Sequence, residues 1–276
     1  MTAALLAPDL ERLRDLLSRG AVAVLSGAGL STESGIPDYR GPTGALRRHG
    51  PMTYQEFVGS PAARRRYWAR SYLGWQQIAN ARPNEGHRAV AALQQRGVVD
   101  GIITQNVDGL HQAAGARDVI ELHGGLDLVV CVGCGIRERR RSLDARLRAA
   151  NAAFVATAGR INPDGDVELT DAQLDGFVPV GCGHCSSDLL KPDVVFFGEN
   201  VPRARVDACY RLVEQAKALL VLGSSLTVMS GLRFVRRAAA LHIPVAIVNQ
   251  GETRGDPLAE LKIDAPLGEV LPALVA

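Results

Sequence analysis

Short apolar runs recur along this chain and alternate with segments of helical periodicity. Residues 9–19 place four leucines on one helical face and end at Gly20, a residue that commonly terminates helices. Four valine-rich runs have the pattern of fully buried parallel strands, at residues 21–26, 98–104, 218–223 and 243–249. Helical periodicity precedes three of them, at residues 85–96, 203–216 and 232–241. The alternation predicts an α/β protein with a doubly wound, Rossmann-like parallel sheet.

Each predicted strand ends in polar or glycine-rich sequence. These ends are Gly27-Ala28-Gly29, Thr104-Gln105-Asn106, Gly223-Ser224-Ser225 and Asn249-Gln250-Gly251. Four strand ends converging on one crevice favour a large nucleotide over a small metabolite. Glycines after the first strand permit the backbone to approach a pyrophosphate closely. Thr32 stands where the usual dinucleotide fingerprint has its third glycine, so a hydride-transferring dehydrogenase is disfavoured.

Residues 125–190 break this rhythm and predict an inserted zinc-binding module. Two C-x-x-C pairs, Cys131/Cys134 and Cys182/Cys185, offer four thiolates for tetrahedral zinc. The gap of 47 residues between the pairs exceeds the roughly 15–20 of common zinc ribbons. The longer loop costs on the order of 1 kcal/mol, against roughly 10–16 kcal/mol for structural zinc. We therefore predict one structural ion, with free thiols, a redox pair or His184 as a substitute ligand as alternatives.

The predicted domains are a discontinuous nucleotide-binding domain at 1–124 and 191–276, with a helical and cofactor-loop insertion within 40–80, and the zinc module at 125–190. The 276 residues carry a formal net charge of +2, which gives no general reason to expect nucleic-acid or membrane binding. Arginines at 137–148 alternate with Glu138 and Asp144, which predicts a solvated helix face rather than a nucleic-acid patch. Thiol-rich sequence without a membrane span predicts a cytoplasmic protein. Cys209 is expected to be a core residue in a helix.

The full run that begins at Gly27 resembles the signature loop of sirtuins. It reads GAGLSTESGIPDYR through Arg40, with Tyr39 where many sirtuins have phenylalanine. Further matches follow in sirtuin order: TQNVDGLH at 104–111, ELHG at 121–124, the two cysteine pairs, LKPDVVFFGE at 190–199, GSSL at 223–226 and Asn249. The resemblance covers roughly residues 10–271. The wide cysteine gap, residues 67–70 and residues 190–197 resemble the class II branch.

The resemblance implies an NAD-dependent protein-lysine deacetylase or deacylase. Such an enzyme removes acetyl or longer acyl groups from acylated lysine, giving nicotinamide, O-acyl-ADP-ribose and free lysine. It implies that His123 is the general base acting through the ribose hydroxyls, and that Asn106 and Asp108 hold the ribose and the nicotinamide carboxamide. The implied NAD-binding residues also include Gly27, Ala28, Gly29, Thr32, Pro37, Asp38, Tyr39, Arg40, Gln105, Gly223, Ser224, Ser225, Asn249, Gln250, Gly251 and Leu267.

The substrate is expected to enter as an extended peptide. Val195, Gly198 and Glu199 lie in a strand-like segment whose backbone can pair with another strand. Phe197 is expected to line an apolar acyl-lysine tunnel, although a Val-Val-Phe-Phe run is also typical of plain core.

Several alternatives remain open at the level of the sequence. Tyr67 and Arg70 match the Tyr-x-x-Arg spacing of sirtuins that prefer acidic acyl groups. Protein ADP-ribosylation is a second possible activity. Outside this enzyme class, a zinc-ribbon nucleic-acid-binding protein and an NAD-dependent oxidoreductase are the competing hypotheses. The sequence does not indicate the oligomeric state.

Overall fold

The larger sheet has six parallel strands in the order β3-β2-β1-β7-β8-β9. In this computed structural model the described residues are 3–40, 50–156, 159 and 162–276, so part of the insertion expected within 40–80 lies outside them. The strands are β1 (Val22–Ser26), β2 (Val99–Thr104), β3 (Val119–Glu121), β7 (Ala218–Leu222), β8 (Val245–Val248) and β9 (Leu261–Ile263). The strand order reverses between β1 and β7, which is where a doubly wound sheet binds its ligand.

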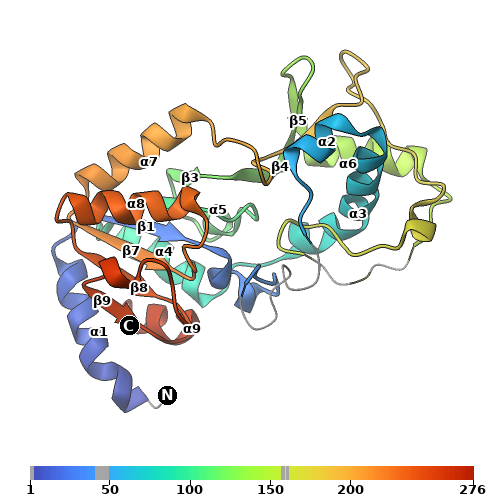
Figure 1. Ribbon diagram of the computed structural model, residues 1–276. Coiled ribbons are helices and arrows are strands. Elements are labelled where there is room, and N and C mark those ends of the chain that lie inside the picture. The colour runs from blue at the N-terminus through green and yellow to red at the C-terminus, as the bar shows by residue number, and fades with distance from the viewer. Residues whose placement is uncertain (1–2, 41–49, 157–158, 160–161) are drawn as a thin grey trace.

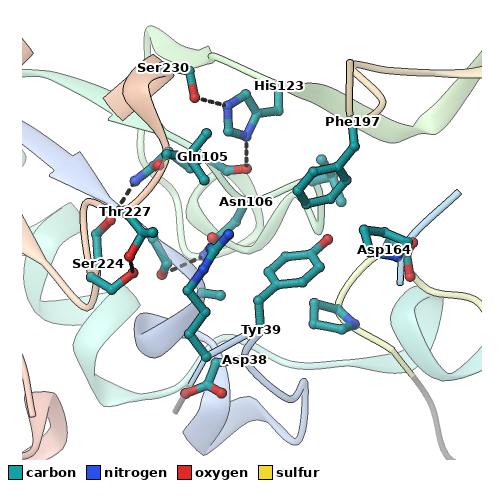
Figure 2. A pocket seen from close by; sticks show the side chains of 18 of the residues that line it. Asp38, Tyr39, Gln105, Asn106, His123, Asp164, Phe197, Ser224, Thr227 and Ser230 are labelled. Atoms are coloured by element: carbon teal, nitrogen blue, oxygen red, sulfur yellow. Dashed lines mark hydrogen bonds between the residues drawn. The ribbon is translucent and has the colours of Figure 1, made fainter. Parts of the chain in front are cut away.

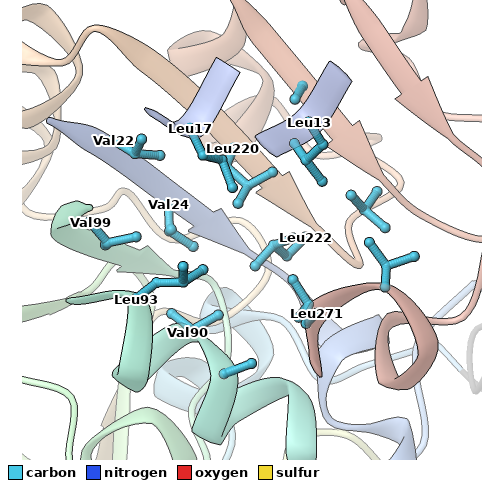
Figure 3. Packing of buried hydrophobic residues seen from close by; sticks show 14 of the residues in the cluster. Leu13, Leu17, Val22, Val24, Val90, Leu93, Val99, Leu220, Leu222 and Leu271 are labelled. Atoms are coloured by element: carbon cyan, nitrogen blue, oxygen red, sulfur yellow. The ribbon is translucent and has the colours of Figure 1, made fainter. Parts of the chain in front are cut away.

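Helices cover both faces of this sheet. One face packs against α1 (Ala3–Ser18), α4 (Glu85–Gln95) and α9 (Leu267–Ala273), and the other against α7 (Arg203–Gln215) and α8 (Met229–Ala240). Strand β1 divides its side chains between the two cores: Val22 and Val24 enter the first, while Ala23 and Leu25 enter the second. Figure 3 shows the first core around Val24 and Leu220. Burial on both faces explains why these strands read as continuous apolar runs.

A smaller lobe lies beside the large sheet (Figure 1). Its three-stranded antiparallel sheet contains β4 (Gly124–Cys131) between β5 (Arg137–Arg139) and β6 (Leu190–Val194). Helices α2 (Tyr54–Gly59), α3 (Pro61–Asn80) and α6 (Arg140–Ala150) pack into the same core. This lobe therefore joins segments from before, within and just after the predicted module. Within the described residues, the remaining elements are α5 (Leu110–Ala113) and the 3-10 helices η1 (Ala28–Leu30), η2 (Thr32–Ser34), η4 (Asp171–Leu174) and η5 (Asp256–Leu258).

The arginines of α6 only partly form a solvated face, so that prediction was wrong for Arg140. This side chain is 2% exposed and pairs with Asp144 at 3.3 Å. Its guanidinium carbon lies 5.3 Å from the ring centroid of Trp68 and 5.1 Å from that of Trp75. Arg140 therefore joins α6 to α3 through cation–π contacts. Cys209 is fully buried in α7, as predicted.

Among the described residues, no helix combines the length and the apolar character that crossing a membrane requires.

Candidate active site

A cavity of about 840 Å³ lies between the carboxyl ends of the large sheet and the smaller lobe. Most of the residues that the sequence singled out line it, including the ends of β1, β2, β7 and β8 and the segment after β6. Three of the predicted NAD-binding residues do not line the cavity that the described chain forms: Thr32, Pro37 and Leu267. Thr32 instead donates a hydrogen bond to the carbonyl of Gly29 at 3.0 Å, and Leu267 is buried in the core. The four strand ends thus form one site.

The loops after β1 and β7 touch through their glycines. The amide of Gly29 donates to the carbonyl of Gly223 at 2.8 Å. Gly223 has φ +60°, and a Cβ built on it would lie 2.5 Å from the backbone nitrogen of Leu30. Both the positive φ and the lack of space require glycine here. The resulting backbone surface lies at the switch point, where the sequence predicts that a pyrophosphate binds.

Asn106 and Asp108 share one hydroxyl group with the loop after β1. Ser31 Oγ donates to Asp108 Oδ2 at 2.7 Å and accepts from Asn106 Nδ2 at 3.0 Å. Asn106 Nδ2 also donates to the carbonyl of Gly27 at 3.0 Å, and Asp108 Oδ1 accepts from the amide of Leu110 at 2.9 Å. Burial raises the pKa of Asp108, against the hydrogen bonds from Leu110 and Ser31 that favour its carboxylate. The two side chains are therefore fixed in orientation.

His123 lies between the two lobes, immediately before β4. Its Nδ1 is 3.0 Å from the carbonyl oxygen of Gln105, and its Nε2 is 2.8 Å from Ser230 Oγ (Figure 2). A carbonyl can only accept, so Nδ1 carries the proton and Nε2 holds a lone pair on the cavity side. Burial lowers the pKa of His123, an effect opposed by the Gln105 hydrogen bond and reinforced by the charges of Arg205 and Arg233. The lowered pKa favours the neutral imidazole, and its Nε2 lone pair accepts a hydrogen bond from the Ser230 hydroxyl.

A buried polar chain runs beneath the dinucleotide side of the cavity. Ser26 Oγ donates to Thr104 Oγ1 at 2.9 Å and lies 2.8 Å from His111 Nε2. The ring of His111 packs edge to face on His87, with centroids 5.2 Å apart. Burial lowers the pKa of His111 to about 3 and that of His87 to about 4. Both histidines are neutral structural residues, linked through Thr104 to the amide of Asn106.

The segment after β6 is fixed by a partly buried ion pair. Lys191 Nζ is 3.0 Å from Glu199 Oε2, which also accepts from the amide of Phe196 at 2.9 Å. The amide of Val195 donates to the carbonyl of His123 at 2.7 Å, which places this segment against the base. Strand β6 ends at Val194, and Phe197 forms an isolated parallel bridge with Thr53. The predicted strand-like segment is thus an irregular, anchored loop along the cavity.

At the end of the cavity away from Ser224, aromatic rings and one acidic residue form the wall. Tyr39 and Phe197 pack edge to face at 6.1 Å, and Asp164 lies beyond them (Figure 2). Tyr67 also lines this end. Arg70, in contrast, lies outside the described lining and pairs with Asp166 at 3.1 Å, both side chains being 8% exposed. The Tyr-x-x-Arg motif therefore presents its tyrosine but not its arginine to the cavity.

The four knuckle cysteines come together in the smaller lobe. Their sulfurs lie within 4.8 Å of one another, with Cys131 to Cys185 at 3.6 Å and Cys134 to Cys182 at 3.8 Å. Zn–S bonds of about 2.3 Å give S–S edges of about 3.8 Å in a tetrahedron. Amide hydrogen bonds from Cys185 and His184 lower the pKa of Cys182 to about 6, which favours the thiolate. The donor set and spacing fit a structural zinc ion, as predicted.

Sequence reasoning did not identify Ser31, Ser230 and Asp164 as site residues. Ser31 lies inside the signature loop, and its position there was the available signal. Ser230 follows the GSSL segment but belongs to α8, and no local pattern pairs it with His123. Asp164 comes from the turn-rich stretch of the zinc module, 41 positions beyond His123 in the chain. Only the tertiary structure brings Asp164 to the cavity.

The fold and the site together define an α/β protein that binds a dinucleotide against a zinc-bearing lobe. The sequence pattern of the Sir2 family matches residues 27–230, and the chain belongs to this family. A Streptomyces coelicolor protein named NAD-dependent protein deacetylase 1 is 61% identical over 95% of this chain and 88% of its own. A Bordetella bronchiseptica NAD-dependent protein deacetylase is 48% identical, covering 97% and 98%.

Solved structures of Sir2 enzymes have the same fold. A Sir2 structure with a p53 peptide and NAD+ matches with a TM-score of 0.76 and 31% identity, covering 96% of each chain. Another, with deacetylated p53 peptide and 3'-O-acetyl ADP ribose, matches with a TM-score of 0.78 and 31% identity, covering 95% of each chain. The Rossmann-like architecture and the sirtuin resemblance are thereby confirmed.

Proposed function

We propose that this protein is an NAD-dependent protein-lysine deacetylase. The observation that carries the proposal is the position of His123, whose Nε2 lone pair lies where the glycine-rich strand ends meet the aromatic end of the cavity. A base at this junction can act on a ribose hydroxyl of the cofactor while an acyl-lysine is held on the other side. The relatives named as NAD-dependent protein deacetylases support the same activity.

The remaining side chains have positioning roles in this proposal. NAD, when bound, supplies the glycosidic bond whose cleavage releases nicotinamide and allows the acyl group to leave lysine. Gly29 and Gly223 present backbone to the pyrophosphate, and Ser31 holds Asn106 and Asp108 toward the ribose and carboxamide. Gln105, through its carbonyl, keeps the proton of His123 on Nδ1.

The substrate side is formed by the anchored loop at 195–199. Peptide backbone would lie along Val195, Gly198 and Glu199, with the acyl-lysine chain passing Phe197 toward the aromatic end. Gly198 has φ +77° and is exposed, so it can be approached by another backbone. Few side chains of the loop can contact the side chains of a bound peptide, which supports broad tolerance of peptide sequence. A structural zinc ion would be bound by Cys131, Cys134, Cys182 and Cys185. Four sulfur ligands leave no open coordination position for catalysis.

The test is one incubation of purified protein with acetyl-lysine peptide and NAD, followed by product mass. We expect free lysine peptide, nicotinamide and O-acetyl-ADP-ribose in equal amounts. ADP-ribose attached to protein would favour the transferase alternative, and the ultraviolet absorbance of NADH would favour an oxidoreductase. The removal of longer acyl groups and a cytoplasmic location stay predictions from the sequence.

A further inference from the structure

The carboxyl group of Asp164 is held in the cavity by a built turn. Residues 162–166 form a loop in which the amide of Asn162 donates to the carbonyl of Asp166 at 2.8 Å, and Asn162 Nδ2 donates to Asp166 Oδ1 at 2.6 Å. Gly165 supplies a positive φ of +76°. The loop is fastened to α3, because Arg70 Nε donates to the carbonyl of Val167 at 2.8 Å and its guanidinium pairs with Asp166. The contacts of the residues on both sides of Asp164 therefore fix its position.

Asp164 has an unused hydrogen-bond acceptor in this position. Within the described chain, its Oδ1 atom is buried and makes no hydrogen bond of normal distance and angle, although the carboxyl group of Asp166 interacts with the same side chain. The hydroxyl of Tyr67 is buried in the same wall. No described residue lies at normal hydrogen-bond distance and angle from it. A buried polar atom left unpaired is unfavourable because it has lost its hydrogen bonds to water. A ligand that brings a donor to this end of the cavity would remove that cost.

The charge at this end also disfavours an anion. Burial, followed by the neighbouring carboxylate of Asp166, raises the pKa of Asp164 to about 7, whereas the Arg70 guanidinium acts in the opposite direction. The same two carboxylates contribute, after burial, to a raised pKa for Tyr39 and for Tyr67. A second carboxylate placed here would meet a desolvated wall and the partly ionised Asp164 rather than a guanidinium. A hydroxyl would meet an acceptor in either protonation state of Asp164.

We propose that Asp164 selects the acyl group: the enzyme favours acyl chains that carry a hydroxyl and disfavours acyl chains that end in a carboxylate. The inference rests on the proposed deacylase function and specifies which acyl groups the enzyme prefers. It runs opposite to the acidic preference that the Tyr67-x-x-Arg70 spacing suggests, because Arg70 is occupied by Asp166.

The experiment compares four modifications of one lysine in one peptide: acetyl, butyryl, 3-hydroxybutyryl and succinyl. The measurement is kcat/KM for nicotinamide release at saturating NAD. A net hydrogen bond of about 0.5–1.5 kcal/mol corresponds to a preference of about 2- to 12-fold for 3-hydroxybutyryl over butyryl. We expect succinyl to fall at least about tenfold below butyryl, because its carboxylate meets Asp164.

Two variants separate the effect of the hydrogen-bond acceptor at Asp164 from the effect of its charge. In Asp164→Ala we expect the hydroxybutyryl-to-butyryl ratio to fall to about one. In Asp164→Asn the amide oxygen still accepts, so the hydroxyl preference should persist while the discrimination against succinyl weakens. Ratios within each enzyme cancel any general loss of activity, and unfolding midpoints with zinc content verify that both variants fold.

The outcomes distinguish this inference from the function on which it rests. Turnover of acetyl peptide with equal rates for butyryl and 3-hydroxybutyryl in the unmodified enzyme would overturn the role of Asp164 and leave the deacetylase intact. Succinyl as the preferred substrate would overturn it as well. Release of nicotinamide with none of the four peptides would refute the deacylase function itself.

Discussion

The two sides of the cavity differ in how their residues come together. On the dinucleotide side, each wall segment directly follows a strand of the parallel sheet, so its position is set by a few local residues. On the acyl side, α3, the loop at 162–166 and the segment after β6 meet through tertiary contacts between distant parts of the chain. The first side is built by sheet register and the second by packing and metal binding. A change confined to one side should therefore affect that side more than the other.

Removal of the zinc ligands should have the largest effect and should fall on the acyl side. Structural zinc contributes roughly 10–16 kcal/mol in apparent terms, more than the core of so small a lobe can replace. We expect Cys134→Ser to lose zinc, to unfold the smaller lobe and to abolish deacetylation. Metal analysis, circular dichroism and nicotinamide release measure the three effects.

Cys209→Ser is the matched control for this change. Cys209 is buried in α7 against the large sheet and lies outside the four-cysteine cluster. We expect it to retain one zinc ion per chain and to lose only part of its stability. Equal zinc content in the two variants would contradict the assignment of the cluster.

Replacement of His123 should affect the point where the two sides meet. General-base catalysis contributes about 10²- to 10⁴-fold, so His123→Ala should lower kcat by that range. NAD affinity, peptide affinity and zinc content should change little, because the backbone of His123 still accepts from Val195. Single-turnover formation of deacetylated peptide and isothermal titration check the two parts of this prediction.

Ser230→Ala distinguishes the base from its neighbour. Ser230 Oγ is the hydrogen-bond partner of Nε2 at 2.8 Å, but the tautomer is set by Gln105 on the other nitrogen. We therefore expect a loss of about tenfold or less from this variant, since one neutral hydrogen bond contributes about 0.5–1.5 kcal/mol. A loss equal to that of His123→Ala would show that Ser230 takes part in the proton transfer.

The contrast between the two sides also explains what the sequence could predict. Valine-rich runs with polar ends predicted β1, β2, β7 and β8 to within two residues of each bound, because a strand buried on both faces has a continuous apolar signal. The cysteine pairs predicted their own convergence, since zinc coordination dictates four ligands. Asp164, Ser230 and Arg140 had no comparable local signal. Ser230 meets His123 and Arg140 meets Trp68, 107 and 72 positions away in the chain, and Asp164 is placed by the pairing of Asp166 with Arg70.

Gly223→Ala should weaken the dinucleotide side alone. The positive φ costs an alanine about 1–2 kcal/mol, and its Cβ would lie 2.5 Å from Leu30 N and 2.7 Å from Gly29 C. The loops after β1 and β7 must then separate, so we expect a raised KM for NAD and a loss of more than about 2 kcal/mol in stability. The KM for peptide should change little.

Gly20→Ala isolates the conformational part of this effect. Gly20 has φ +65°, an added Cβ would meet nothing within 4 Å, and the residue does not belong to the cavity lining. We expect a loss of about 1–2 kcal/mol in stability without a change in the KM for NAD. If the two variants gave the same KM, close contact of the loops would not be needed for binding.

The histidine pair beneath the dinucleotide side should make the stability of the fold depend on pH. The folded-state pKa values of about 3 for His111 and about 4 for His87 lie below the value of about 6.5 for a free histidine. The unfolded chain therefore binds protons first, so the free energy of unfolding is full above about pH 6.5 and falls as the pH drops toward 4. Each histidine should contribute a slope of about 1.4 kcal/mol per pH unit.

His111→Gln tests this contribution because glutamine keeps a polar partner for Ser26 without titrating. Urea unfolding of both proteins from about pH 7.5 to about pH 4.5, a range that spans the ordinary histidine pKa, gives two stability curves. Subtracting one curve from the other cancels the contribution of every titrating group that the two proteins share. We expect the difference between the curves to shrink by about 1.4 kcal/mol for each pH unit below about 6.5. Parallel curves would mean that His111 is protonated within the fold, which would contradict the buried, neutral chain that supports Thr104 and Asn106.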